Sequence, residues 1–195
     1  MKNETDAGRN YIAMYMGSEL AENGWPMNYW SFKPVEQNGN VSTTVTHTSW
    51  WDNPPTLTAS AAGLSDKMSQ YTVILKNGAM ILYCDGRKVA ENLSTGINLS
   101  ELQKDGKQIG RIGISPYEAN GDIYYKGDIR DVRIYDGALG DEEIMTLYRE
   151  TKAEEGLLLH YDFSKVQTGA DGTVSADTAV PDLSGNGYTG TIKQN

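Results

Sequence analysis

Short stretches of apolar and β-branched residues, separated by turn sequences, recur along this chain of 195 residues. The clearest three cover residues 71–76, 79–84 and 87–90, with Asn77-Gly78 and Asp85-Gly86 between them. Asn-Gly and Asp-Gly readily adopt the positive φ angles of a type I′ turn, whose twist matches that of antiparallel strands. The pattern therefore predicts a three-stranded antiparallel meander.

Other stretches of the same kind predict further strands. They cover residues 11–16, 41–49, 109–115, 123–135, 157–163 and 188–193. Within the fourth of these the apolar side chains change face, because Ile129 differs in parity from Val132 and Ile134. A β-bulge near Arg130-Asp131 would restore one buried face and re-aim the Asp131 side chain. Asp131 is therefore a candidate functional carboxylate, although an ordinary solvent-facing aspartate explains the pattern equally well.

One segment has helical rather than strand periodicity. The acids at 141–143 suit the first turn of a helix, where they complement the helix dipole. Ile144, Leu147 and Tyr148 then fall on one face at helical spacing. The pattern predicts one short helix near residues 141–150, packed on a sheet, and the polar run 152–156 after it indicates a linker. The fold class is accordingly all-β with one accessory helix.

Composition and charge exclude several classes of protein. The chain has 17 Lys and Arg against 26 Asp and Glu, a formal net charge of −9, which argues against a nucleic-acid partner because phosphate-binding surfaces are basic. No apolar run approaches the roughly 18 residues of a membrane span. The single Cys84 forms no disulfide within the chain, and with His47 and His160 as the only histidines a His/Cys zinc site lacks ligands.

Two segments resemble a known family. Residues 127–144 (GDIRDVRIYDGALGDEEI) resemble the closing strand and acidic helix of laminin G-like, concanavalin A-type jelly-roll domains. Residues 71–89, with the run LYCDGR, resemble the hairpin that precedes it. The resemblance implies a two-sheet antiparallel jelly-roll sandwich over residues 1–150, in which residues 1–40 match the family poorly.

The tail of the chain resembles the opening of the same family. This likeness lies in residues 157–163 (LLLHYDF) and 182–191 (DLSGNGYTGT). Because the order is end first and beginning second, two interpretations stand side by side. Residues 157–195 are either the opening strands of a second laminin G-like module or permuted strands that complete the first. A short linker favours tandem modules, whereas the need to cover an open sheet edge favours permutation.

The resemblance also implies a structural calcium ion. Calcium takes about six to eight oxygen ligands, and the matching positions here are Asp131, Asp182 and Asn186. The sequence departs from the family's pattern at two places, where Ser164-Lys165 and Arg130 replace acids. Both changes remove negative charge. Turn chemistry without a metal is the alternative explanation of the 182–187 loop.

An aromatic cluster is the best local indication of a ligand site. Trp50 and Trp51 are adjacent, so on a strand they point to opposite faces and at most one of them joins the core. The other would be exposed beside Asp52 and Asn53, an arrangement that suits a sugar ring. Three more aromatic residues could extend this platform: Trp25, Trp30 and Tyr117. The alternative is that these rings pack the sandwich or a neighbouring domain.

The resemblance implies a non-catalytic, lectin-like carbohydrate-binding module of a secreted bacterial glycoside hydrolase or surface protein. Its partners would be a glycan or polysaccharide and other domains of the same polypeptide, at an extracellular or cell-surface location. A structural or protein-interaction spacer is the main alternative. A catalytic glycanase is a weaker one, because the Glu-x-Asp-x-x-Glu string of sandwich glucanases is missing and the acids at 141–143 are explained by the helix start.

Overall fold

A computed structural model describes residues 1–3, 12–18, 28–34, 40–46, 53–60, 67–103, 108–115, 124–150 and 156–193. The chain forms two compact units, unit 1 (Met1–Asp128) and unit 2 (Ile129–Asn195), and each is described by itself. The division into a module of residues 1–150 and opening strands from 157 stays a prediction. No helix of the described part is long and apolar enough to cross a membrane.

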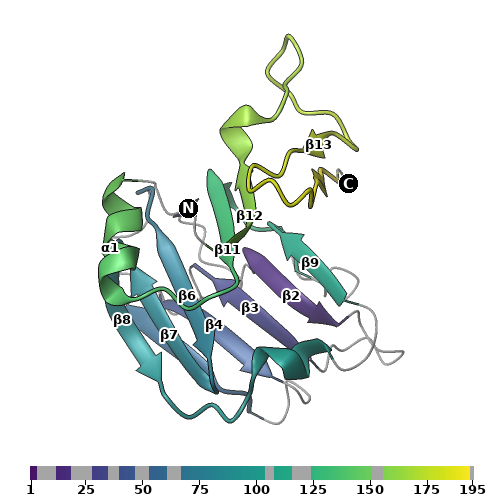
Figure 1. Ribbon diagram of the computed structural model, residues 1–195. Helices are drawn as coiled ribbons and strands as arrows, with labels where there is room; N and C mark the ends of the chain where they lie inside the picture. Colours follow the sequence, from purple (N-terminus) through teal and green to yellow (C-terminus); the bar gives the residue numbers. More distant parts are fainter. Residues whose placement is uncertain are drawn as a thin grey trace. The chain divides into compact units, whose positions relative to one another are not determined.

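A five-stranded antiparallel sheet is the larger element of unit 1 (Figure 1). Its strands, in spatial order, are β5 (Thr56–Ser60), β4 (Asn40–Thr46), β3 (Tyr29–Lys33), β2 (Met14–Ser18) and β9 (Gln108–Ile112). A separate short pair joins β1 (Lys2–Asn3) to β10 (Gly127–Asp128). The predicted strands at 11–16, 41–49 and 109–115 thus correspond to β2, β4 and β9.

The second sheet of unit 1 is the predicted meander. It consists of β6 (Tyr71–Lys76), β7 (Ala79–Cys84) and β8 (Arg87–Asn92), followed by a 3-10 helix η2 (Leu99–Gln103). At its two turns, φ is 51° and 73° for Asn77 and Gly78, and 49° and 75° for Asp85 and Gly86. These positive angles are those of a type I′ turn, and the meander prediction is confirmed.

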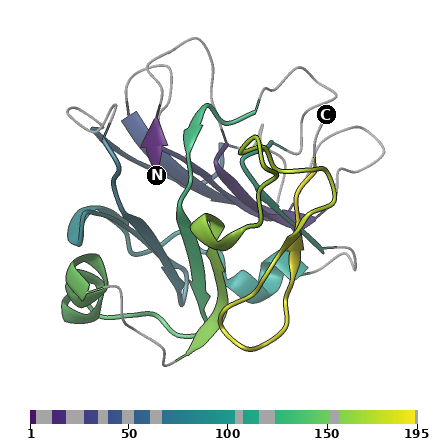
Figure 2. The same ribbon diagram turned by 90° about the horizontal axis from the view of Figure 1, so that it is seen from above.

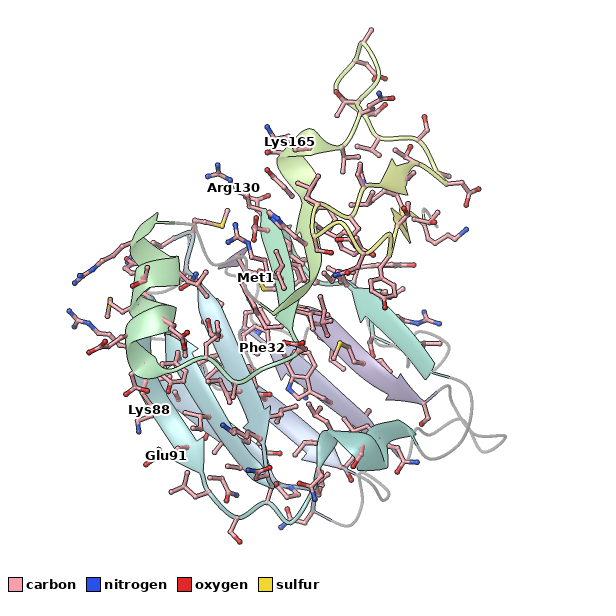
Figure 3. The ribbon with its side chains drawn as sticks, in the orientation of Figure 1. Met1, Phe32, Lys88, Glu91, Arg130 and Lys165 are labelled. Carbon is pink, nitrogen blue, oxygen red and sulfur yellow. The ribbon has the colours of Figure 1, made fainter. Side chains whose placement is uncertain are left out.

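The two sheets of unit 1 meet through the apolar face of the larger one. Cross-strand partners share a face, and the paired side chains there are Trp30 with Val45 and Phe32 with Thr43. Phe32, labelled in Figure 3, packs on Tyr71 of β6 with ring centroids 5.2 Å apart. The Thr43 hydroxyl lies 3.9 Å from the sulfur of Met80 on β7. Unit 1 is therefore a two-sheet antiparallel sandwich with its core between these faces.

Unit 2 contains an antiparallel pair, β11 (Asp131–Tyr135) and β12 (Leu157–Asp162), whose strands run side by side in Figure 2. Between them comes α1 (Asp141–Glu150), which confirms the predicted helix. Its Glu143 carboxylate accepts from the Gly140 amide at 2.6 Å, as a capping side chain does. The tail adds η4 (Phe163–Lys165) and the short pair β13 (Ala179–Val180) and β14 (Gly190–Thr191).

Two predicted strands differ from the structure. The stretch 123–135 is not one bulged strand: β10 pairs with β1 and β11 with β12, so the chain changes partner at 129–130. The parity change is absorbed by this break, and the only irregularity within the β11–β12 pair lies at Ile134/Tyr135. The stretch 188–193 forms only β14, because the backbone groups of Tyr188 bind the side chains of Asp182 and Tyr161 instead of a strand.

Candidate functional site

The face of the five-stranded sheet opposite the core is mostly polar, and we call it the polar face. Its side chains follow from the register, since residues paired across strands lie on the same side. Besides Asn40, Gly17 and Ile109, the described strands place on it two tyrosines, seven serines or threonines and two cations. They are Tyr15, Tyr29, Ser31, Lys33, Ser42, Thr44, Thr46, Thr56, Thr58, Ser60 and Arg111.

The centre of the polar face is buried and one margin is exposed. Ser42 and Thr44 are 1% and 2% exposed, whereas Thr56, Thr58 and Ser60 of β5 are exposed. The hydroxyls of Thr44 and Thr56 lie 3.0 Å apart and form a hydrogen bond. The β5 margin is therefore the part of the polar face that a ligand reaches directly.

Tyr15 and Tyr29 form a buried apolar cluster on this side of the sheet, together with Ile12 and Ile109. The rings of Tyr15 and Tyr29 stack with centroids 5.5 Å apart, and the Tyr15 hydroxyl donates to the Ser18 carbonyl at 2.7 Å. Burial raises the pKa of Tyr15 well above its usual range, and the neighbouring Tyr29 raises it further. Tyr15 is accordingly a neutral hydrogen-bonding group at any physiological pH.

Most of the predicted aromatic platform lies outside the described residues. This holds for Trp25, Trp50, Trp51, Asp52 and Tyr117. Trp50 and Trp51 belong to the connection between β4, which ends at Thr46, and β5, which begins at Thr56. Both of these end residues are on the polar face. Asn53, in the same connection, is exposed and has a left-handed φ of 54°.

Trp30 does not extend a platform, and that prediction is wrong. It is 7% exposed in the middle of β3, on the apolar face. Its indole Nε1 donates to the Thr43 hydroxyl at 2.8 Å. Strand alternation places Trp30 toward the second sheet, so the alternative that this ring packs the sandwich is correct for it.

The predicted metal ligands Asp131 and Asp182 meet at His160 in unit 2. The His160 Nε2 lies 2.8 Å from Asp131 Oδ2, and the His160 backbone amide donates to Asp182 Oδ1 at 3.0 Å. Arg133, the cross-strand partner of His160, lies with its Nε 2.9 Å from Asp131 Oδ1. Burial would lower the pKa of Arg133, but the Asp131 carboxylate, together with Tyr135, outweighs burial and raises it. Asp131 is thus half of an ion pair.

The Asp182 carboxylate accepts four hydrogen bonds. Besides the His160 amide, its donors are the Ser184 amide at 2.9 Å, the Ser184 hydroxyl at 2.8 Å and the Tyr188 amide at 3.1 Å. Burial would raise the pKa of Asp182, but hydrogen bonds from His160, Ser184 and Tyr188 outweigh it and hold that pKa well below the usual range. Asn186 uses its amide nitrogen, which donates to the carbonyls of Leu157 and Leu158 at 3.0 Å each.

These contacts do not fit a calcium site. A calcium ligand offers a free oxygen, but each Asp182 oxygen already accepts two donors and Asp131 is paired with His160 and Arg133. Two cations, Arg130 and Lys165, lie at the same end of unit 2 (Figure 3). Within the described ranges no group of three or more His, Cys, Asp or Glu could hold a metal ion.

The opposed carboxylates Asp131 and Asp162 do not form a catalytic pair either. They are cross-strand partners, but the Ser164 hydroxyl donates to Asp162 at 2.6 Å and its amide at 3.0 Å. The hydroxyl bond of Ser164 is the largest cause that lowers the pKa of Asp162. A glycosidase acid needs a raised pKa to donate its proton, whereas the pKa of Asp162 is lowered.

The sequence reasoning missed the polar face. The available indication was alternation within NVSTTVT (40–46) and YWSFK (29–33), where residues with a polar group occupy every second position. Each strand taken alone looks like an ordinary amphipathic strand. Only the register shows that the polar positions of β2, β3, β4, β5 and β9 gather on one side.

The geometry defines an antiparallel sandwich with one polar sheet face. A laminin G-like family model described as the concanavalin A-like lectin/glucanases superfamily matches residues 2–145. The chain therefore belongs to this superfamily, which confirms the resemblance predicted from its sequence. Among curated proteins, none matches the sequence.

Three solved structures were found to be similar to this chain. The CBM40 of the Ruminococcus gnavus IT-sialidase, bound to α2,3-sialyllactose, has a TM-score of 0.60 and 15% identity, covering 75% of this chain and 78% of that one. The same module with α2,6-sialyllactose gives 0.47 and 13%, covering 63% and 65%. Residues 221–444 of an S-layer domain-containing protein from Clostridium thermocellum give 0.37 and 23%, covering 76% and 67%. The first of these confirms the expected jelly-roll sandwich.

Proposed function

We propose that this chain is a non-catalytic carbohydrate-binding module. Its ligand would contact the β5 margin of the polar face and the adjoining tryptophan pair, Trp50 and Trp51. The observation that carries the proposal is a sheet face in which hydroxyl, tyrosine and cationic side chains gather on one side of a sandwich. The shared fold with a module solved in complex with sialyllactose supports the same class of ligand.

The chemistry of this face suits a sugar. Hydroxyl side chains both donate and accept hydrogen bonds, as sugar hydroxyls require. An aromatic ring offers an apolar surface to the C–H groups of a pyranose. Thr56, Thr58 and Ser60 supply the first kind of group at an exposed position, and the tryptophan pair supplies the second. Small shallow sites of this type bind in the millimolar to micromolar range, about −4 to −8 kcal/mol.

The proposal extends to the setting of the module. We place it outside the bacterial cell, as an accessory part of a larger glycoside hydrolase or surface protein. The source of the structure with a TM-score of 0.60, a bacterial sialidase, supports this setting. Other domains of the same polypeptide would then be its covalent partners.

Affinity electrophoresis through gels that contain plant or host polysaccharides, together with a glycan array, tests the proposal. The full chain should be retarded by at least one glycan, and Trp50→Ala or Trp51→Ala should weaken this binding about tenfold, or about 1.4 kcal/mol. Tyr148→Ala is the matched control, because Tyr148 is a 45% exposed aromatic residue on α1. No retention on any glycan, or full retention by both tryptophan variants, contradicts the proposed site.

A protein-interaction spacer is the second candidate function. Three large apolar side chains of unit 2 favour it, namely Leu158, Leu183 and Tyr188, which are 38%, 47% and 59% exposed. Exposed apolar groups of this kind are found at domain contacts. The same gels separate the two candidates, since a spacer shows no retention on any polysaccharide.

A further inference from the structure

Among the described residues of unit 2, one edge of β12 has no strand beside it. The opposite edge pairs with β11, which leaves the outward backbone groups of Leu158 and His160 without a ladder. Unpaired groups on a sheet edge form a template for pairing with another chain. Proteins therefore cover such edges, and the tail of unit 2 supplies the cover (Figure 2).

Residues 182–188 form hydrogen bonds with the outward backbone groups of Leu158 and His160 on this edge. The His160 amide donates to the Asp182 carboxylate at 3.0 Å, and the His160 carbonyl accepts from the Leu183 amide at 2.8 Å. The Leu158 carbonyl accepts from the Asn186 amide nitrogen at 3.0 Å. The Ser184 hydroxyl, 2.9 Å from this carbonyl, shares its single proton between the carbonyl and Asp182 Oδ2. Three side chains and one backbone amide of the loop thus form the hydrogen bonds that the backbone of a neighbouring strand would otherwise form with this edge.

The carboxylate that reaches β12 also closes the loop on itself. Asp182 accepts from Ser184 near the start of the loop and from Tyr188 at its end. The Tyr161 hydroxyl of β12 donates to the Tyr188 carbonyl, so both backbone groups of Tyr188 are held. Asp182 therefore connects both ends of the loop to the strand that it covers.

We propose that residues 182–188 are a metal-independent cap on the free edge of β12, held by the Asp182 carboxylate. A calcium ion at this place would displace protein donors from Asp182. In the metal interpretation the Asn186 side chain presents its oxygen to the ion. In the cap it presents its nitrogen to two carbonyls.

The substitution Asn186→Asp separates the two interpretations. At a calcium site it adds a negative charge and strengthens binding of the cation. At the cap it places carboxylate oxygens against the carbonyls of Leu157 and Leu158, which is repulsive and destabilises the loop. Asp182→Ala removes the acceptor of His160, Ser184 and Tyr188 and should open the cap. Asp171→Ala is the matched control, because Asp171 also accepts from a nearby amide and hydroxyl, those of Thr173, without contacting a strand.

The experiment measures the full chain in EDTA and in millimolar calcium chloride, by thermal unfolding and by amide hydrogen exchange. We expect the wild-type midpoint to agree within about 1 °C in the two conditions. Asp182→Ala and Asn186→Asp should accelerate exchange of the His160 amide about tenfold or more in both conditions, and Asp171→Ala should leave it unchanged.

Two results would overturn the proposal. One is a calcium-dependent rise of the wild-type midpoint that Asp182→Ala abolishes and Asn186→Asp enlarges, which would establish a metal site. The other is unchanged protection of the His160 amide in Asp182→Ala, which would show that this carboxylate does not hold the cap. Should Asp182→Ala fail to fold, Asn186→Asp and the wild-type comparison still decide between cap and metal.

Discussion

The ionisation of a single side chain in this protein is set by its immediate surroundings. Cys84, on β7, is 8% exposed, and burial raises the pKa of its thiol to about 11, with a further contribution from the negative charge of Asp85. The thiolate is the reactive form of cysteine. Cys84 is therefore neutral in the folded protein over the whole physiological range.

The raised pKa of Cys84 predicts slow modification of its thiol and a free energy of unfolding that depends on pH. At pH 8, thiol-reactive dye should modify native Cys84 about 100-fold more slowly than the unfolded chain, since two pKa units separate the two states. The unfolding free energy should be constant below the ordinary thiol pKa and fall as pH rises from there to about 11, because only the unfolded thiol ionises in that window. Urea unfolding of the wild type and Cys84→Ala across this range checks the sign. Equal pH dependence in both proteins would refute it.

A hydrogen bond explains how the indole ring of Trp30 is accommodated on the apolar face of β3. Its indole nitrogen donates to the Thr43 hydroxyl, which in turn donates to the Ser31 carbonyl at 3.1 Å. A buried indole N–H without an acceptor costs about 1–3 kcal/mol. The Thr43 hydroxyl therefore makes the apolar face of β3 suitable for this tryptophan.

At the scale of the elements, β2 and β3 lie close together at Gly17. A Cβ added at Gly17 of β2 would lie 2.5 Å from the Cα of Tyr29 and would also collide with the Asn28 carbonyl. These are backbone atoms of the neighbouring strand, which cannot move without disturbing the sheet. In contrast, a Cβ at Gly110 of β9, which pairs with β2 on its other side, meets nothing within 4 Å.

Gly17→Ala should therefore destabilise the protein by about 1–3 kcal/mol, as overpacking does. Gly110→Ala should be neutral or stabilise by about 0.5–1 kcal/mol, because alanine loses less backbone entropy in a strand. The difference in urea midpoint between the two variants measures the effect. If both variants unfold at the same urea concentration, the close approach of β2 and β3 at Gly17 does not affect the free energy of unfolding.

At the scale of the whole molecule, the strands differ in their burial and in the number of strands hydrogen-bonded to them. In unit 1, β3 and β4 each have a hydrogen-bonded strand on both sides, and all of β3 is buried. In unit 2, β13 and β14 have two residues each and pair only with each other. Local opening requires least free energy where few buried apolar contacts and few ladder bonds must break.

Amide hydrogen exchange should follow this order. The amides of β3 and β4 should exchange slowest, by unfolding of unit 1, and those of Ala179 and Val180 in β13 should exchange at least about 100-fold faster. Deuterium uptake of the full chain, read by peptide mass spectrometry, measures the ratio. Equal protection of β3 and β13 would show that the tail and unit 1 open together.

Much of the fold was predictable because its determinants are local. The meander follows from Asn77-Gly78 and Asp85-Gly86, whose backbone preferences set both turns. The helix follows from its acidic first turn and its apolar spacing. The candidate sites were harder to predict. The polar face needed the register of five strands, and the role of Asp182 needed its contact with His160, which lies 22 residues away in the sequence.

By itself, therefore, the sequence determined the short elements, their turns, the all-β class and the superfamily. Tertiary structure alone decided which side chains meet: that Trp30 packs inward, that hydroxyls of distant strands share one face, and that the DLSGNG loop covers the edge of β12. The physical reason is the distance along the chain over which each determinant acts. Backbone preferences act over a few residues, whereas pairing register and hydrogen-bond saturation depend on segments that the folded chain brings together.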